Sequence, residues 1–197
     1  MTVDYAEAFN QALDAIDAGD VTGARALLEG VVTADPRDGE AVILLAKLER
    51  EEGLAEGARQ RLEALVELLP SQVDGRVELA DLLLELGETS LAATHLRAVL
   101  VERPNHWEAL LLLGDAFTDA GAHAEAGAAY QECLESNPFS GDAWFNLGAS
   151  LEAQGQGHAA AAAYQGYLQV RPDAEDHEEV SAHVERLERE ADKSHLS

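Results

Sequence analysis

The tetrapeptide Ala34-Asp35-Pro36-Arg37 decides the fold, because its proline recurs at one constant interval along the chain. The five prolines are evenly spaced: Pro36, Pro70, Pro104, Pro138 and Pro172. A glycine lies half an interval before every proline: Gly19, Gly53, Gly87, Gly121 and Gly155.

Three further positions recur at the same interval. One is always alanine: Ala24, Ala58, Ala92, Ala126 and Ala160. One is always small: Ala12, Ala46, Ala80, Gly114 and Gly148. One is leucine or tyrosine: Leu28, Leu62, Leu96, Tyr130 and Tyr164. This shared period predicts an internal repeat.

Each recurring residue has a physical role in a pair of antiparallel helices. Glycine adopts positive φ without steric cost and therefore suits the turn between the two helices. Alanine or glycine on each helix lets the two backbones approach closely. Proline ends the second helix because it has no amide hydrogen to donate. One such hairpin cannot bury both of its apolar faces, so the sequence predicts a stack of hairpins.

At these positions the chain resembles the tetratricopeptide repeat (TPR) family. The fifth repeat has the fullest set of family residues: Trp144, Leu147, Gly148, Leu151, Gly155, Ala160, Tyr164 and Pro172. The first repeat departs most, with Ala8 and Gln11 where the family prefers a bulky aromatic residue and leucine. The resemblance implies an all-α fold, a right-handed α-solenoid of stacked antiparallel helix pairs (TPR superhelix). It divides residues 1–174 into five units (5–38, 39–72, 73–106, 107–140, 141–174), with a capping helix and frayed tail at 175–197.

Several local features fit this arrangement. N-caps after the prolines are predicted at Asp38, Asn105, Ser140 and Asp173. Residues 174–193 read as one polar helix whose narrow apolar stripe would pack on the fifth repeat; the stripe is Val180, Val184, Leu187 and Ala191. The single cysteine, Cys133, falls on a core-facing position and is predicted to be an inert thiol.

The charge of the chain limits its partners. The formal net charge is −25, from 38 acidic and 13 basic residues. Nucleic acids and anionic membrane surfaces require lysine and arginine, so this balance argues against both and favours basic or neutral partners. The N-terminal residues lack a secretory signal pattern, and every apolar run is far shorter than a membrane span requires. We therefore expect a cytoplasmic protein without membrane insertion.

The resemblance also implies a binding surface on the first helix of each unit. In the family, ligands contact the concave face through these helices, which here would place an apolar floor between acidic walls. The implied groove residues are Phe9, Asn10, Leu13, Ile43, Lys47, Asp74, Val77, Glu78, Asp81, Glu108, Leu111, Asp115, Asp119, Asp142, Phe145 and Asn146. Such a groove would bind a basic or amphipathic peptide, with its charges steered by the acidic field.

Two alternatives for the acidic walls stay open. The acid can be a general property of the surface, since the basic residues are almost all arginine rather than lysine, which fits a salt-adapted or GC-rich host. It can equally select the ligand, and both can hold together. The carboxylate clamp by which some family members bind acidic chaperone tails is absent, because its positions hold Leu111, Asp115, Glu40 and Leu44. The amides of Asn10 and Asn146 could still bind a peptide backbone.

No residue pattern points to catalysis. A nucleotide-binding loop and a nucleophile elbow are both missing from the sequence. His177 and His183 do not share a helix face, so we predict no metal site and no cofactor. The sequence therefore predicts a non-catalytic protein-interaction module. The alternative is a self-assembling TPR scaffold that recruits proteins to a complex or organelle, like the family's organelle-associated bacterial members, in which case the chain would form homo-oligomers.

Overall fold

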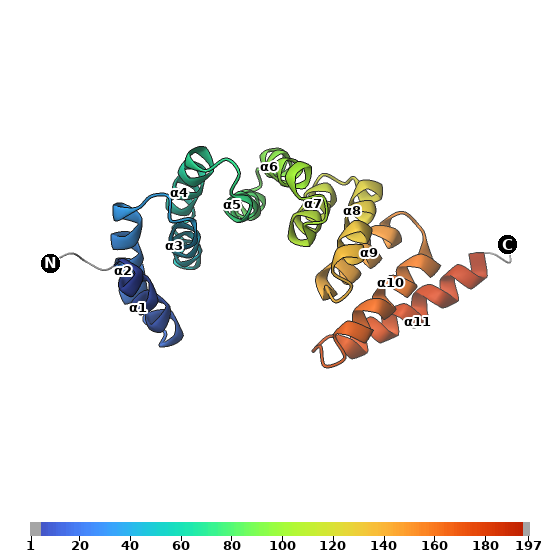
Figure 1. Cartoon of the computed structure of the whole chain (residues 1–197). Helices are drawn as coiled ribbons and strands as arrows, with labels where there is room; N and C mark the ends of the chain where they lie inside the picture. The colour runs from blue at the N-terminus through green and yellow to red at the C-terminus, as the bar shows by residue number, and fades with distance from the viewer. Residues whose placement is uncertain (1–4, 195–197) are drawn as a thin grey trace. The chain divides into compact units, whose positions relative to one another are not determined.

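The computed structural model describes residues 5–194, which contain eleven α-helices and no strand (Figure 1). The first helices of the repeats are α1 (Tyr5–Asp17), α3 (Gly39–Glu51), α5 (Val73–Glu85), α7 (Trp107–Asp119) and α9 (Gly141–Ala153). The second helices are α2 (Val21–Ala34), α4 (Ala55–Leu68), α6 (Thr89–Glu102), α8 (His123–Ser136) and α10 (Gly157–Val170). The last helix is α11 (His177–Ser194). The predicted class, an all-α solenoid of helix pairs, is confirmed.

The chain forms two compact units, and their boundary falls at Gly87. Unit 1 contains α1 to α5 and unit 2 contains α6 to α11. The third repeat therefore contributes its first helix to unit 1 and its second helix to unit 2. Within each unit, every helix packs against the next one along the chain. In Figure 1 unit 1 runs from blue into green and unit 2 from green to red.

The five turn glycines have the backbone conformation that their spacing predicted. Each has a positive φ between 70° and 78°, and none of the other residues described by the structure has a positive φ. A side chain in this region would be strained, which explains why glycine recurs at the turn. The recurring alanines face the core of each hairpin and are fully buried: Ala24, Ala58, Ala92, Ala126 and Ala160.

Two repeats of unit 2 replace the alanine–leucine pair of unit 1 by a glycine–tyrosine pair. In unit 1, Ala12 packs in one core with Leu28. In unit 2, a Cβ atom added to Gly114 would lie 2.3 Å from Tyr130 Cε1, and one added to Gly148 would lie 2.8 Å from the Tyr164 ring. The tyrosine ring therefore occupies the space that an alanine methyl group takes in unit 1.

The helix caps follow the sequence prediction in part. Asp38 and Ser140 accept hydrogen bonds from the backbone N–H groups of Ala41 and Ala143, so these two N-caps are confirmed. The prediction for Asn105 is wrong by one position, because His106 Nδ1 accepts from Ala109 N instead. The prediction for Asp173 is wrong, because turn residues lie between it and the start of α11 at His177.

Helix α11 packs on α10 through the predicted apolar stripe. Val180, Val184 and Leu187 are buried in the core of unit 2. The helix extends to Ser194, and residues 195–197 of the predicted tail lie outside the described part of the chain.

Cys133 is a buried free cysteine in the core of unit 2, as predicted. Its burial raises the pKa of the thiol to about 11, with Ser140 opposing the shift through a hydrogen bond and the charge of Asp115 adding to it. A protonated, enclosed thiol is a poor nucleophile, so Cys133 has the properties of a core side chain.

Candidate functional site

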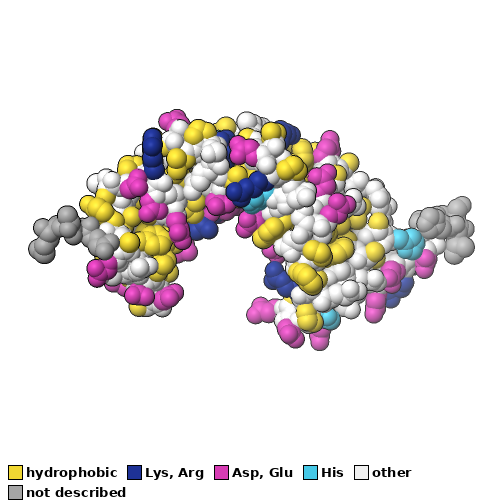
Figure 2. Space-filling view, in the orientation of Figure 1, with side chains coloured by type: hydrophobic (Ala, Val, Ile, Leu, Met, Phe, Trp, Pro, Cys, Tyr) yellow, Lys and Arg dark blue, Asp and Glu magenta, His cyan; other side chains and the backbone are white. Residues whose placement is uncertain are grey.

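The predicted apolar floor forms a series of partly exposed side chains on the first helices. In unit 1 these are Phe9, Ile43 and Val77, on α1, α3 and α5. In unit 2 they are Leu111 on α7 and Phe145 on α9, and Phe145 is 37% exposed. Figure 2 shows hydrophobic and acidic side chains intermingled on the visible face of both units. Each unit therefore presents apolar surface beside carboxylates.

Unit 1 contains an ion-pair cluster that the sequence prediction did not include. Arg50, on α3, donates from Nη1 to Glu78 Oε1 (2.5 Å) and from Nη2 to Asp81 Oδ2 (2.9 Å) on α5. It also donates from Nε to Glu85 Oε2 (3.2 Å) and from Nη2 to the other oxygen of Glu85. Lys47 Nζ lies 3.1 Å from Glu78 Oε2. We call Lys47, Arg50, Glu78, Asp81 and Glu85 the Arg50 cluster.

The Arg50 cluster changes how the acidic wall of unit 1 is interpreted. Burial alone would lower the pKa of the Arg50 guanidinium, but the hydrogen bonds and charges of Glu85 and Asp81 outweigh it and raise the pKa. Glu78 is only 9% exposed, so its charge is directed at Arg50 and Lys47 rather than at solvent. Glu78 and Asp81 were predicted to select the charge of a ligand; here they hold α5 against α3.

The other predicted residues of unit 1 are exposed. Asn10 and Leu13 lie on α1, and Leu13 is 39% exposed. Asp74, in the first turn of α5, is also exposed. These residues are accessible to a partner, but their role in binding stays a prediction.

In unit 2 the predicted residues Asp115 and Asn146 contact each other. Asp115 Oδ1 accepts hydrogen bonds from Tyr130 OH (2.7 Å) and from Asn146 Nδ2 (3.0 Å). Burial, followed by the charge of Asp115, raises the pKa of Tyr130, which keeps the phenol protonated as a donor. Asn146 was predicted to bind a peptide backbone, but its amide N–H₂ group already joins α9 to α7. Its carbonyl oxygen is the part that a ligand could use.

The remaining predicted acids of unit 2 are exposed on the first helices. Glu108 lies 4.0 Å from His106, and Asp142 lies 3.6 Å from Arg171. Asp119 ends α7 and contacts no lysine or arginine among the described residues. Two of these three acids therefore have no lysine or arginine of residues 5–194 as an ion-pair partner.

Helix α11 adds a pocket to unit 2 that the sequence prediction missed. Its volume is about 610 Å³, and it lies between α9, α10 and α11. We call it the cap pocket, and its lining includes Phe145, Glu152, Tyr164, Asp176, Glu179 and Arg186. The pocket joins the predicted floor residue Phe145 to polar side chains of α11 and the turn before it.

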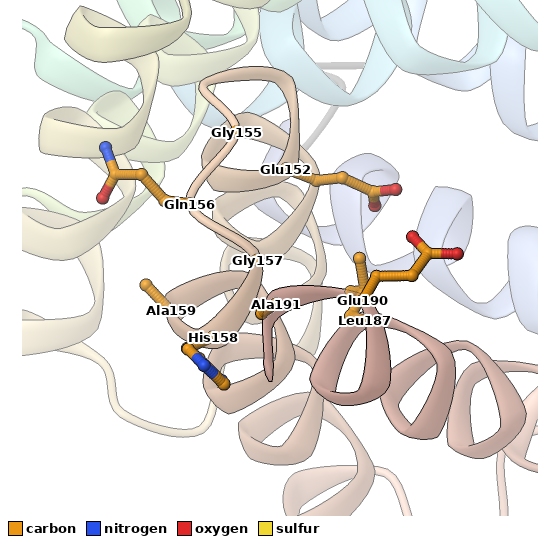
Figure 3. Close-up of a pocket in the computed structure, with 9 residues that line it drawn as sticks. All are labelled: Glu152, Gly155, Gln156, Gly157, His158, Ala159, Leu187, Glu190 and Ala191. Carbon is orange, nitrogen blue, oxygen red and sulfur yellow. The ribbon is translucent and has the colours of Figure 1, made fainter. Parts of the chain in front are cut away.

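A second opening of about 590 Å³ lies between the α9–α10 turn and α11 (Figure 3). The backbone of Gly155, Gln156 and Gly157 forms one side of it, and Leu187 and Ala191 of α11 lie on the other. A Cβ atom on Gly157 would lie 3.3 Å from that of Ala191, so glycine permits this close approach. The opening is a gap between packed helices and brings no reactive set together.

Neither a metal centre nor a membrane span is found in residues 5–194. In that range no three histidine, cysteine, aspartate or glutamate side chains are grouped to hold a metal ion. None of the helices described combines the length and apolar character needed to cross a membrane.

Comparisons with known proteins give one consistent result. Three models of the tetratricopeptide repeat match residues 15–72, 77–139 and 129–162. Among curated protein sequences, none matches the chain.

Solved structures with the same arrangement come from several sources. The thermophilic TPR protein TTC0263 of Thermus thermophilus is 19% identical with a TM-score of 0.73, covering 93% of this chain and 98% of that chain. MamA (41-end) from Desulfovibrio magneticus RS-1 is 18% identical with a TM-score of 0.75, and the match covers 89% of this chain and 99% of that chain. YrrB, described as a TPR protein with an unusual peptide-binding site, is 18% identical with a TM-score of 0.68, and the match covers 93% of this chain and 92% of that chain. At these identities the likeness is one of fold.

Proposed function

Because the chain belongs to the tetratricopeptide repeat family, we propose that it is a non-catalytic protein-interaction module that binds a basic, amphipathic peptide segment of another protein. The segment would lie on the first helices of the repeats. Its apolar side chains would contact the partly exposed floor residues, and its lysine or arginine side chains would face the surrounding carboxylates.

One observation in unit 2 carries this proposal. Leu111 and Phe145 are apolar and accessible on first helices, and Asp119, Glu152 and Glu179 lie on α7, α9 and α11 without contacting any lysine or arginine of the described residues. An apolar surface next to unneutralised carboxylates is complementary to a basic, amphipathic segment. Peptide binding by the structurally similar YrrB supports the same class of ligand.

The packed helices would contribute to affinity through rigidity. Side chains on the first helices are held by a core that extends along each unit. The protein therefore loses little conformational entropy on binding, and most of the ordering cost falls on the peptide. The acidic field would mainly raise the association rate and would weaken with added salt.

The test is a charge reversal on the first-helix face of unit 2. We expect Glu108→Lys with Asp119→Lys to lower partner binding by about tenfold or more, because both exposed carboxylates would repel the basic segment after reversal. The matched control reverses Glu132 and Glu135 on the second helix α8, which changes the total charge equally. Capture from the host lysate, followed by mapping of the bound segment, measures the effect.

The outcome is clear in either direction. A positively charged, amphipathic segment retained by wild type and the control, but not by the first-helix variant, would support the proposal. Equal retention by all three proteins would overturn it. Asp81 and Asp115 are unsuitable targets, since the first pairs with Arg50 and the second accepts the Tyr130 hydroxyl proton in a hydrogen bond.

A self-assembling scaffold is the second candidate, and the exposed Phe139 favours it. This side chain is 81% exposed in the turn before α9, where the other repeats have the polar residues Arg37, Ser71, Asn105 and Asp173. Trp144 Nε1 donates to the carbonyl oxygen of Pro138 (2.9 Å), so the turn holds Phe139 outward. Phenylalanine is among the side chains enriched in protein interfaces, so Phe139 is a candidate contact residue.

Light scattering over a range of concentrations tests the scaffold. We expect the wild type to form oligomers as its concentration rises, and Phe139→Ser to lower the association constant by about tenfold, because a large apolar side chain would leave the contact. Phe145→Ser serves as the control for a general loss of exposed apolar surface. A wild-type protein that stays monomeric throughout would exclude this candidate.

A further inference from the structure

The exposed ring in the cap pocket is held in place by other rings. The centroid of the Phe145 ring lies 5.4 Å from that of Tyr164 and 5.4 Å from that of Tyr167. The angles between the ring planes are 69° and 68° respectively. Tyr164 lies in turn 5.2 Å from His183 at 78°. Edge-to-face contacts of this kind are favourable and orient the rings. Phe145 therefore presents a fixed aromatic surface, part of which stays open to solvent.

Two carboxylates beside this ring are oriented by hydrogen bonds. Glu152 Oε2 accepts from His183 Nε2 (2.8 Å) and from Tyr164 OH (3.4 Å). Asp176 Oδ1 accepts from Tyr167 OH (2.7 Å). Burial and the neighbouring Glu152 raise the pKa of Tyr164 to about 12, so this hydroxyl stays a donor. In both carboxylates the second oxygen receives no hydrogen bond from the described residues.

The arginine of the pocket itself does not neutralise these acids. Arg186 Nη2 donates to His183 Nδ1 (2.5 Å), which leaves Nε2–H of that ring to donate to Glu152. Because a guanidinium can only donate, Nδ1 of this ring is the acceptor and Nε2 is the donor to Glu152. Glu179, on the adjacent turn of α11, contacts no lysine or arginine of the described residues. The pocket thus contains three carboxylates and a single guanidinium, whose Nη2 group donates to His183 rather than to a carboxylate.

We propose that the cap pocket binds the side chain of an arginine in the partner segment, with the guanidinium over the Phe145 ring and its N–H groups donating to Glu152, Asp176 and Glu179. Guanidinium groups stack on aromatic rings and form paired hydrogen bonds with carboxylates, whereas an ammonium group lacks this planar geometry. The apolar side chains of Val180 and Ala182 also line the pocket and would contact the aliphatic part of the arginine.

The volume and position of the pocket agree with this ligand. About 610 Å³ is enough for one long side chain with its flanking backbone, and lies within the usual range of binding pockets. The pocket lies at the end of the first-helix face of unit 2, where the proposed segment would leave the repeats. This inference rests on the proposed function, because the basic segment supplies the arginine.

The experiment uses acetyl-Leu-Arg-Leu-amide as a probe of the full chain, followed by amide NMR at millimolar peptide. We expect saturable shifts in α9, α10 and α11 and binding at least about tenfold weaker for the neutral isostere with citrulline in place of arginine. Glu179→Gln and Phe145→Leu should each weaken the arginine peptide by about tenfold, because one loses a charge and the other the ring. Glu185→Gln, an equal charge change on α11 outside the pocket, should leave binding unchanged.

Equal affinity for the arginine and citrulline peptides, or an absence of saturable shifts around Phe145, would overturn the inference. Its failure can be told from failure of the proposed function with the partner captured from lysate. If Glu179→Gln and Phe145→Leu retain that partner like wild type while the Glu108 and Asp119 reversal loses it, the interaction function stands and the arginine site is wrong. If the reversal also retains the partner, the proposed function itself is wrong.

Discussion

Replacing Gly114 with alanine is expected to destabilise unit 2 by about 2–3 kcal/mol, in the range measured for overpacked cores. The added Cβ would lie 2.3, 2.6 and 2.8 Å from three carbons of the Tyr130 ring, well inside van der Waals contact. The ring cannot easily move away, because its hydroxyl group hydrogen bonds with Asp115 and Thr118 and its side chain is fully buried. Chemical denaturation with hydrogen exchange resolved over α7 and α8 would measure the loss and locate it.

Two variants make this prediction specific. Tyr130→Leu in the Gly114→Ala background would recreate the alanine–leucine pair that Ala12 and Leu28 form in unit 1, so we expect it to recover much of the lost stability. Gly127→Ala is the control, because its nearest neighbour would be 3.5 Å away, an ordinary contact. It should be neutral or stabilising by up to about 1 kcal/mol, since alanine favours a helix more than glycine does. A Gly114→Ala protein as stable as Gly127→Ala would show that the tyrosine does not require the glycine.

This pair also shows why the fold could be predicted from the sequence. The turn glycine, the small residue and the proline act through their own backbone geometry, so their effects are local and the period reveals them. The exchange of alanine–leucine for glycine–tyrosine is visible in the printed sequence, but only the contact between the two side chains explains it. Cap positions were less predictable, because adjacent residues can both serve as an N-cap. At α7 the cap is His106, one residue after the predicted Asn105.

The candidate site was less accessible from the sequence, because its contacts join neighbouring first helices. Arg50 meets Asp81, Asp115 meets Asn146, and Glu152 meets His183, and each pair is separated by 31 residues. The separation is slightly less than one period of the repeat, so a search for complementary polar residues at this spacing could have found all three. Without it, Glu78 and Asp81 were assigned to a ligand rather than to Arg50.

The same separation explains how α11 completes unit 2. His183 contacts α9 in the way that Asp81 contacts α3, so α11 occupies the place of a further first helix although the proline period ends at Pro172. Its residues therefore line the proposed binding surface as well as capping the core. The sequence predicted only a polar capping helix whose apolar stripe packs on the fifth repeat, because that stripe is its clearest pattern.

Removing Arg50 should have the other large effect, a loss of about 3 kcal/mol from unit 1 in Arg50→Ala, as expected when one partner leaves a mostly buried ion pair. Only 17% of the Arg50 side chain and 11% of that of Glu78 are exposed, so the Glu78 carboxylate would be left poorly solvated. Glu78, Asp81 and Glu85 would also repel one another along one face of α5. Denaturation with hydrogen exchange resolved over α3 and α5 would measure the change.

The ion-pair explanation predicts how other changes modify this loss. Arg50→Lys should fall between wild type and alanine, because one ammonium group cannot donate to three carboxylates in the planar pattern of a guanidinium. Glu78→Gln in the Arg50→Ala background should recover stability, since it removes a buried charge that has lost its arginine. Added salt should reduce the difference in stability between Arg50→Ala and wild type by screening the repulsion.

The control is Arg37→Ala, because Arg37 is exposed and forms no ion pair with the described residues. It should change stability by less than about 0.5 kcal/mol. If Arg50→Ala were no more harmful than Arg37→Ala, the cluster would not hold α3 to α5, and its acids would again be candidates for binding a ligand.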